Sequence, residues 1–234
     1  IKLPRDLRFQ NEESENVFIP RITDSDFKKG ETFYRNFVDN IQLRDPLINM
    51  PECLDICLNK NILSIVSNYF ESLPFMTYIK IVKNYANSYP VFDTQYYHID
   101  ENAYKLLKVF IYLNDVDTDR HGPFCYVKNS YKNVQKHWGK KARWSDVDIN
   151  KLYNKEDILP ICAKKGDVII CNTVAFHKGV KPVEKDRNII IINYGLHQDY
   201  TLGNNLDITS NIRQEDFHKL STLGKNIFKI CNLV

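Results

Sequence analysis

The feature that most constrains the fold is a change of hydrophobic pattern near residue 75. Before it, apolar residues recur at helical spacing, along 24–41 and again along 51–70. After it, short runs of β-branched and aromatic residues alternate with turns, as in 77–82 and 106–115. Helices followed by many short strands predict a helical layer packed on a two-sheet, barrel-like sandwich.

One domain accounts for most of the chain. The 234 residues fit a single β-rich domain with a substantial core, and 20–230 contain no repeat, low-complexity tract or linker. Residues 1–20 are polar and irregular, which predicts a surface arm or linker ahead of a domain spanning 21–234. The segment 131–160 mixes tryptophans and tyrosines with lysines, so it is either a solvated basic helix or an insert that covers a substrate.

Composition argues against several classes of protein. The formal net charge of +3 gives no reason to expect nucleic acid, and no apolar run is long enough to span a bilayer. The start carries no signal-peptide pattern, and the six cysteines lack the spacing of a zinc site. We therefore expect a cytoplasmic protein with reduced thiols and without a nucleic-acid or membrane partner; its oligomeric state is not predicted.

Two histidines and one aspartate have the spacing of a metal site. His98 and Asp100 would point to the same face of a strand, because side chains alternate along β-structure. His177 ends a later apolar run, and two imidazoles with one carboxylate suit Fe(II) with open positions for oxygen chemistry. By itself, His-x-Asp is common, and a lone histidine beside an aromatic residue is more often packed in a core. The remaining histidines have no partner at ligand spacing and receive no metal role: His121, His137, His197 and His218.

Arg187 lies ten residues after His177, a spacing that a strand, a tight turn and a returning strand can span. Gly179 and Pro182 mark that turn, between two apolar runs. The guanidinium would then return beside the metal, where its paired donors can hold a carboxylate. A metal with a carboxylate clamp beside it indicates an enzyme.

The order of these motifs resembles the phytanoyl-CoA dioxygenase family of Fe(II)- and 2-oxoglutarate-dependent oxygenases. The resemblance covers roughly residues 45–200. It rests on the aromatic-His-x-Asp start, the strand Leu107-Lys-Val-Phe-Ile-Tyr-Leu113, the turn Asp115…Gly122-Pro-Phe, Lys165-Gly-Asp-Val-Ile ahead of His177, and Arg187 opening the last core strand. There are two departures from the family pattern. Lys128-Asn-Ser-Tyr131 replaces the usual Pro-Gly-Ser-His, and Ile189 stands where some relatives have a serine.

The resemblance implies a mainly β fold with flanking helices: a double-stranded β-helix core (jelly-roll, cupin-like) with N-terminal helices packed on one sheet. It implies that Fe(II) is bound by His98, Asp100 and His177, and that Arg187 grips the distal carboxylate of 2-oxoglutarate. Phe110 would line the cosubstrate pocket. Lys83 is either a solvent-facing strand end or a second contact to the cosubstrate.

The activity implied by the resemblance is O2-dependent hydroxylation of a C–H bond, with release of succinate and CO2. A carboxylate at Asp100 favours hydroxylation over halogenation, whereas desaturation or cyclisation would use the same ligands. The substrate would be a small or carrier-bound molecule, and the lysines of 131–160 would suit an anionic one. Two other classes stay open: a non-catalytic cupin-like binding module, and a metal-dependent hydrolase or isomerase that uses the same ligands.

Overall fold

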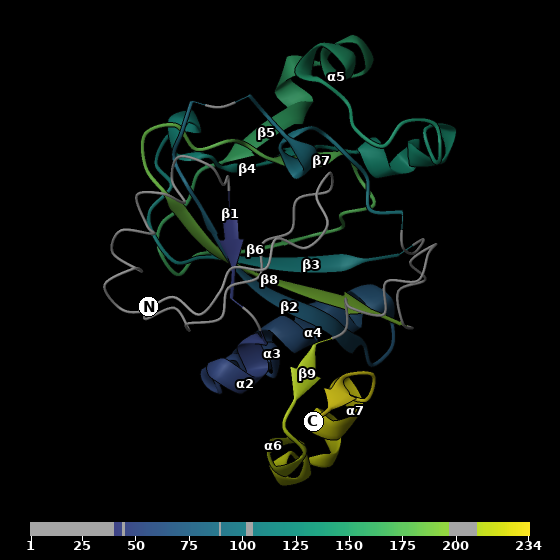
Figure 1. Ribbon diagram of the computed structural model, residues 1–234. Coiled ribbons are helices and arrows are strands. Elements are labelled where there is room, and N and C mark those ends of the chain that lie inside the picture. The colour runs from purple at the N-terminus through teal and green to yellow at the C-terminus, as the bar shows by residue number, and fades with distance from the viewer. Residues whose placement is uncertain (1–39, 44, 89, 102–104, 197–209) are drawn as a thin grey trace, which may run out of the picture.

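The structure, a computed structural model, describes residues 40–43, 45–88, 90–101, 105–196 and 210–234 (Figure 1). The arm predicted at 1–20 lies outside the described residues, as does most of the helix predicted at 24–41. The described end of that predicted helix, Asn40–Gln42, forms strand β1, which pairs with the edge of a sheet.

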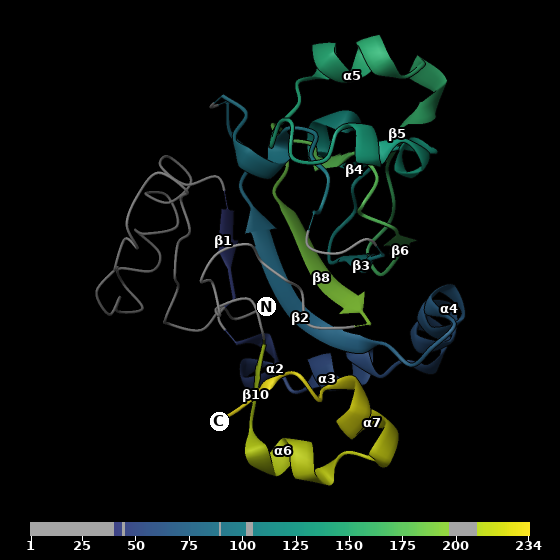
Figure 2. The ribbon, with the colours of Figure 1, turned by 90° about the vertical axis from the view of Figure 1, so that its right-hand side faces the viewer.

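The helix predicted at 51–70 is two helices, α3 (Glu52–Cys57) and α4 (Lys60–Phe70), preceded by the short α2 (Pro46–Asn49). Asn59 separates them because its side chain accepts hydrogen bonds from the backbone amides of Asn61 and Ile62 and so caps α4. The buried faces of these helices pack under the larger sheet (Figures 1 and 2). The predicted helical layer on one sheet is therefore confirmed.

Two antiparallel sheets form the centre of the molecule. The larger has the order β1-β2-β8-β3-β6, and the smaller has the order β5-β4-β7. The strands of the larger sheet are β2 (Phe75–Asn84), β3 (Leu107–Tyr112), β6 (Val168–Cys171) and β8 (Arg187–Gly195). Those of the smaller are β4 (Phe124–Val127), β5 (Ile158–Ile161) and β7 (His177–Gly179). After β3 the chain enters the smaller sheet for β4 and β5, returns to the larger for β6, crosses to the smaller for β7 and returns for β8. This winding of two facing sheets is that of a double-stranded β-helix, which confirms the predicted fold class.

Each face of the larger sheet packs against a different layer. Ile79, Ile81, Val109 and Ile192 face the helices, and the alternate residues face the smaller sheet. That inner face carries a second apolar cluster, which the smaller sheet completes with Phe124: Val82, Phe110, Tyr112 and Ile189. Side-chain alternation thus turns one face of every central strand toward the interior between the sheets.

The segment 131–160 covers the outer face of the smaller sheet. It contains α5 (Asp146–Leu152), and its aromatic rings surround Phe176, with centroid distances of 5.3 Å for Trp144 and 6.0 Å for Tyr153. Phe176 and His177 are adjacent in the chain, so their side chains point to opposite faces. These aromatic side chains therefore form a hydrophobic cluster on the far side of the sheet from His177.

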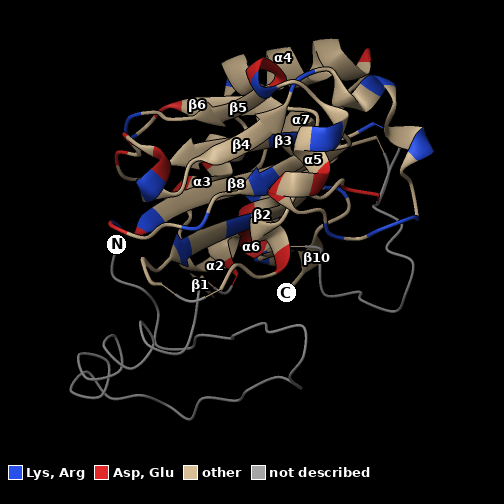
Figure 3. Ribbon diagram, turned by 90° about the horizontal axis from the view of Figure 1, so that it is seen from above, with Lys and Arg blue, Asp and Glu red and all other residues tan. Residues whose placement is uncertain are grey.

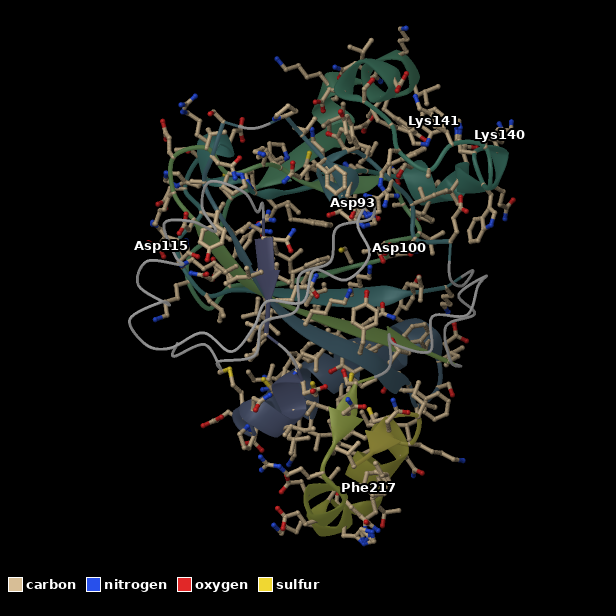
Figure 4. The ribbon with its side chains drawn as sticks, viewed as in Figure 1. Asp93, Asp100, Asp115, Lys140, Lys141 and Phe217 are labelled. Carbon is tan, nitrogen blue, oxygen red and sulfur yellow. The ribbon has the colours of Figure 1, made fainter. Side chains whose placement is uncertain are left out.

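The lysines of the same segment are exposed, and Figure 4 shows Lys140 and Lys141 at the outer edge of the molecule. Over the part of the chain that Figure 3 colours by charge, basic and acidic positions are interspersed. No helix within the described residues has the length and apolar character needed to cross a membrane. All six cysteines are free thiols.

Docking of the segment 131–160 is tested by Ile149→Ala. Ile149 is fully buried on α5, whereas Val147 on the same helix is 62% exposed. We expect Ile149→Ala to lower the free energy of unfolding by about 2–5 kcal/mol, because it removes buried methyl groups and leaves a cavity. Urea denaturation monitored by fluorescence measures this change. Val147→Ala is the matched control and should change it little; equal effects of the two variants would contradict the packing.

The C-terminal part returns beneath the helical layer. It consists of β9 (Asn211–Ile212), α6 (Gln214–Lys219), α7 (Thr222–Ile227) and β10 (Asn232–Leu233). α6 and α7 are separate helices because Leu220 leaves helical geometry and Ser221 caps α7 by accepting from the amide of Gly224. Ile212, Ile227 and Phe228 are fully buried in the cluster that joins this part to the larger sheet.

Candidate metal centre

Three of the predicted site residues meet between the two sheets. His98 and His177 form an antiparallel bridge in which each backbone amide donates to the other residue's carbonyl, at 2.9 and 3.0 Å. The bridge places the two imidazoles side by side, with ring centroids 4.2 Å apart. Asp100 follows on the same face as His98 and lies between the sheets (Figure 4). One ligand atom from each of the three side chains lies within 4.8 Å of the others.

Both imidazoles are oriented by their own backbone. Nδ1 of His98 lies 3.0 Å from the carbonyl of Tyr96, and Nδ1 of His177 lies 2.9 Å from the carbonyl of Ala175. Nδ1 of each ring therefore carries the proton and donates it, which leaves the Nε2 lone pair for another partner. Nε2 of His177 is 3.7 Å from Oδ2 of Asp100. Burial lowers the pKa of both histidines, that of His177 to about 3, so both rings are neutral as ligands must be.

Lys108 holds the carboxylate of this cluster and was not predicted as a site residue. Its Nζ is 2.6 Å from Oδ2 of Asp100, and both side chains are mostly buried. Burial alone would raise the pKa of Asp100, but Lys108 and the two histidines outweigh it and lower the pKa well below its usual range. Asp100 is therefore an ionised carboxylate with a fixed orientation.

Arg187 opens β8 opposite Asn84 of β2 and is 8% exposed. Nε and one terminal nitrogen donate to Oδ1 of Asn84 at 3.0 and 2.6 Å, and the other terminal nitrogen donates to the carbonyl of Gly122. Burial lowers the pKa of Arg187. Within the described residues it has no carboxylate partner. Each terminal nitrogen keeps one unused N–H, and together these form the fork that binds a carboxylate in a bidentate manner.

Two glycines give the guanidinium its space. A Cβ at Gly179 would lie 3.0 Å from a terminal nitrogen of Arg187, and Gly179 shares a strand face with His177. Gly122, whose carbonyl accepts from Arg187, has φ of 74°, and a Cβ there would meet the Val180 carbonyl oxygen at 2.7 Å. The sequence indicated both glycines as turn residues and did not reveal these contacts.

Gly179→Val tests the approach of Arg187 to this strand. The resemblance noted in the sequence implies that Arg187 grips the distal carboxylate of 2-oxoglutarate. Because the added side chain must displace the guanidinium, we expect 2-oxoglutarate affinity to fall about tenfold or more, equivalent to roughly 1.4 kcal/mol. Metal affinity should be retained because the histidines are untouched. Calorimetric titration of both ligands measures the two affinities. Lys178→Ala, which changes the neighbouring side chain on the opposite strand face, is the control; a Gly179→Val protein with normal 2-oxoglutarate affinity would contradict the assignment.

Phe110 lies on the inner face, between Arg187 and the cluster formed by His98, Asp100 and His177, which we call the metal-ligand cluster. The register of β3 with β8 pairs Lys108 with Asn193, Phe110 with Ile191 and Tyr112 with Ile189. Arg187 lies two residues beyond Ile189, at the next position on the same face of β8. The Phe110 ring is 4.5 Å from that of Phe124, which is 5.7 Å from the ring of His177. An apolar band therefore separates two polar ends, as a dicarboxylate with an apolar middle requires.

Lys83 does not join this arrangement. It neighbours Asn84 on β2 and so points to the opposite face of the strand, where its ammonium lies 3.6 Å from Asp186. This placement puts Lys83 on the strand face away from Asn84 and Arg187. The inward-facing lysine of β2 is Lys80, which lies four residues before Asn84 and therefore shares its strand face.

Comparison with solved structures shows a similarity to HygX from Streptomyces hygroscopicus. HygX with nickel and 2-oxoglutarate bound superposes with a TM-score of 0.54 at 16% identity, covering 81% of this chain and 87% of HygX. HygX with nickel, 2-oxoglutarate and hygromycin B bound gives 0.54 at 13% identity, covering 80% and 86%. This likeness shows a shared fold. No family model matches the chain, and no curated protein matches its sequence.

Proposed function

We propose that the protein is an Fe(II)- and 2-oxoglutarate-dependent oxygenase. One observation carries the proposal: a buried cluster of two imidazoles and one carboxylate shares the interior with a buried arginine that has no acidic partner among the described residues. A buried guanidinium without a counter-charge is costly, and a carboxylate ligand removes that cost. HygX, whose structures hold nickel with 2-oxoglutarate, has the same fold and supports the proposal.

The donor set fits Fe(II) on chemical grounds. Two neutral imidazoles and one carboxylate are the ligands that non-haem Fe(II) oxygenases use, and they leave positions open for other ligands. His98, Asp100 and His177 would hold the ion. When bound, it would supply the activation of O2 and the oxidative decarboxylation of 2-oxoglutarate to succinate and CO2.

The surrounding side chains orient the ligands and exclude water. Arg187 would receive the distal carboxylate of 2-oxoglutarate, because Asn84 and Gly122 fix its fork in one direction. Phe110 and Tyr112 line the path between the two ends and keep water from it. Lys108 pairs with Oδ2 of Asp100, the oxygen that also faces Nε2 of His177, and so would fix the orientation of this ligand carboxylate.

We propose hydroxylation of a C–H bond as the reaction. The carboxylate at Asp100 supports it over halogenation. For the substrate we propose a small molecule, since HygX is seen with hygromycin B bound. Arg187 disfavours a hydrolase or isomerase with the same ligands, because such an enzyme has no use for a carboxylate clamp at this place.

Succinate formation tests the proposal. Purified protein with Fe(II), ascorbate and 2-oxoglutarate should release succinate in air, even without primary substrate, and release none when O2 is removed. A hydrolase, an isomerase or a binding module predicts no O2-dependent succinate. Liquid chromatography with mass detection measures the product, and succinate at the level of heat-denatured protein would contradict the proposed function.

A further inference from the structure

A second lysine lies beside the metal-ligand cluster. Lys80 of β2 points inward on the same strand face as Asn84, and its ammonium is 5.2 Å from the centroid of the Tyr78 ring. The ammonium of Lys108 is 5.8 Å from the same ring. Lys80 and Lys108 therefore flank Tyr78 beside Asp100, and we call Lys80, Lys108 and Tyr78 the lysine cluster.

Lys80 has no ion pair within the described part of the chain. Burial lowers the pKa of Lys80, and Lys108 lowers it further; only Asp100 and Asp93 act in the opposite direction. Both of those carboxylates already have a cation of their own. Asp100 pairs with Lys108 at 2.6 Å, and Asp93 accepts from Nε of Arg143 at 2.8 Å.

The ligands of the proposed function do not balance this charge. Doubly ionised 2-oxoglutarate carries as much negative charge as Fe(II) carries positive charge. Binding of both ligands therefore leaves the net positive charge of the interior unchanged. Asp100 acts on Lys80 but already pairs with Lys108, and Arg187 has no carboxylate partner among the described residues. An interior of low dielectric strongly favours a further anion under these conditions.

The distal carboxylate of 2-oxoglutarate is not that anion. Lys80 is four residues from Asn84, which holds Arg187, and four residues of strand span about 13 Å. The ammonium of Lys80 lies over the Tyr78 ring, which is further still from Asn84, whereas the guanidinium is held at Asn84, so the two cations serve different ends of the inner face. The lysine cluster lies at the end of the inner face that carries Asp100, away from Arg187.

We propose that the lysine cluster, through Lys80, binds an oxyanion of the primary substrate, a carboxylate or a phosphate, beside the metal. This inference rests on the proposed function and specifies its substrate class. Lys80 is then a specificity-determining residue: a substrate with an anionic group is accepted, and its neutral analogue is discriminated against. Tyr78 supplies the aromatic surface next to that group.

The test uses protein loaded with Mn(II) and 2-oxoglutarate, and two probes, inorganic phosphate and acetate. Mn(II) enhances the relaxation of 31P or 13C nuclei that bind near it, so NMR relaxation titrations report binding without turnover. We expect saturable enhancement for at least one probe. Lys80→Met should weaken that binding about tenfold or more, and Lys80→Arg should keep it within about threefold, because arginine retains the charge.

Lys83→Met is the matched control, since it removes a lysine from the opposite face of the same strand and should leave the titration unchanged. Removing an unpaired buried charge should not lower the thermal midpoint, so Lys80→Met should fold. Absence of saturable binding by both probes would overturn the inference, as would binding that is unchanged in Lys80→Met.

A loss of 2-oxoglutarate affinity in Lys80→Met, equal to that in an Arg187 variant, would also overturn the inference, because Lys80 would then serve the cosubstrate. The proposed function would survive each of these results. It would fail separately, through the absence of O2-dependent succinate in the wild-type protein.

Discussion

His177→Ala should abolish both tight metal binding and O2-dependent succinate formation. Nε2 of His177 lies 3.7 Å from Oδ2 of Asp100, and its loss leaves His98 and Asp100 as the two remaining ligands. Loss of an outer hydrogen-bond partner of a metal ligand already lowers affinity about ten- to a hundredfold. We therefore expect loss of the ligand itself to weaken metal binding by more than about a hundredfold, measured by competition with a chelator.

The control for this variant is His121→Ala. His121 lies in the turn after β3, where its ring nitrogens are 3.9 Å from Asp117 and 3.8 Å from Glu184. It contributes nothing to the metal-ligand cluster, so its variant should bind metal and form succinate like the wild type. Metal affinity and succinate release that are unaffected by His177→Ala would exclude the three-residue cluster as the metal site.

Arg187→Met should weaken 2-oxoglutarate binding about ten- to a hundredfold while metal affinity stays near normal. A hydrogen bond to a charged partner contributes roughly 1.5–3 kcal/mol, and a difference of 1.4 kcal/mol is a factor of about ten in affinity. Methionine fills much of the same volume without the fork. Titration of 2-oxoglutarate into Mn(II)-loaded protein measures the loss.

Arg120→Met is the matched control, because Arg120 is a surface arginine in the turn next to Gly122 and pairs with Glu184. An exposed pair of this kind contributes about 0–1 kcal/mol, so the variant should bind 2-oxoglutarate normally. If Arg187→Met binds it as the wild type does, another residue is the clamp. Arg187→Lys adds a further comparison: it keeps the charge, loses the bidentate geometry and should recover only part of the affinity.

Local pattern was sufficient to predict the strands and the convergence of His98, Asp100 and His177. The period of two places His98 and Asp100 on one face, and the turn between His177 and Arg187 returns the guanidinium to the interior. Both predictions depend on spacing along neighbouring strands, which a sequence displays directly. The helical layer on one sheet likewise follows from the order of the elements.

Contacts between distant strands were not predictable in the same way. Lys108 lies in an apolar run, and only the approach of Asp100 from the other sheet turns it into an ion-pair partner. The sequence showed that Lys83 lies on a strand near the site, but not which face of that strand points inward. In the structure the inward face carries Lys80, and Lys83 lies on the opposite face. A one-residue difference in phase exchanges the two faces of a strand.

The packing of the aromatic residues of 131–160 was not predictable for a related reason. A cluster of tryptophan and tyrosine between the two halves of a site fits a cover over that site or a layer on the outer face of a sheet. In the structure, Phe176 points away from His177 and the rings of Trp144 and Tyr153 pack around it, so these aromatic residues form a layer on the outer face. The interior is therefore closed on its outer sides by two packed layers, the helices and this segment.

The dependence of 2-oxoglutarate affinity on bound metal tests the central claim most directly. Calorimetric titrations of 2-oxoglutarate into metal-free and Mn(II)-loaded protein give the coupling between the two ligands. A shared site, with the metal held by His98, Asp100 and His177 and the far carboxylate held by Arg187, predicts binding at least about tenfold tighter with metal and no such difference in His177→Ala. Equal affinity with and without Mn(II) in the wild-type protein would contradict it.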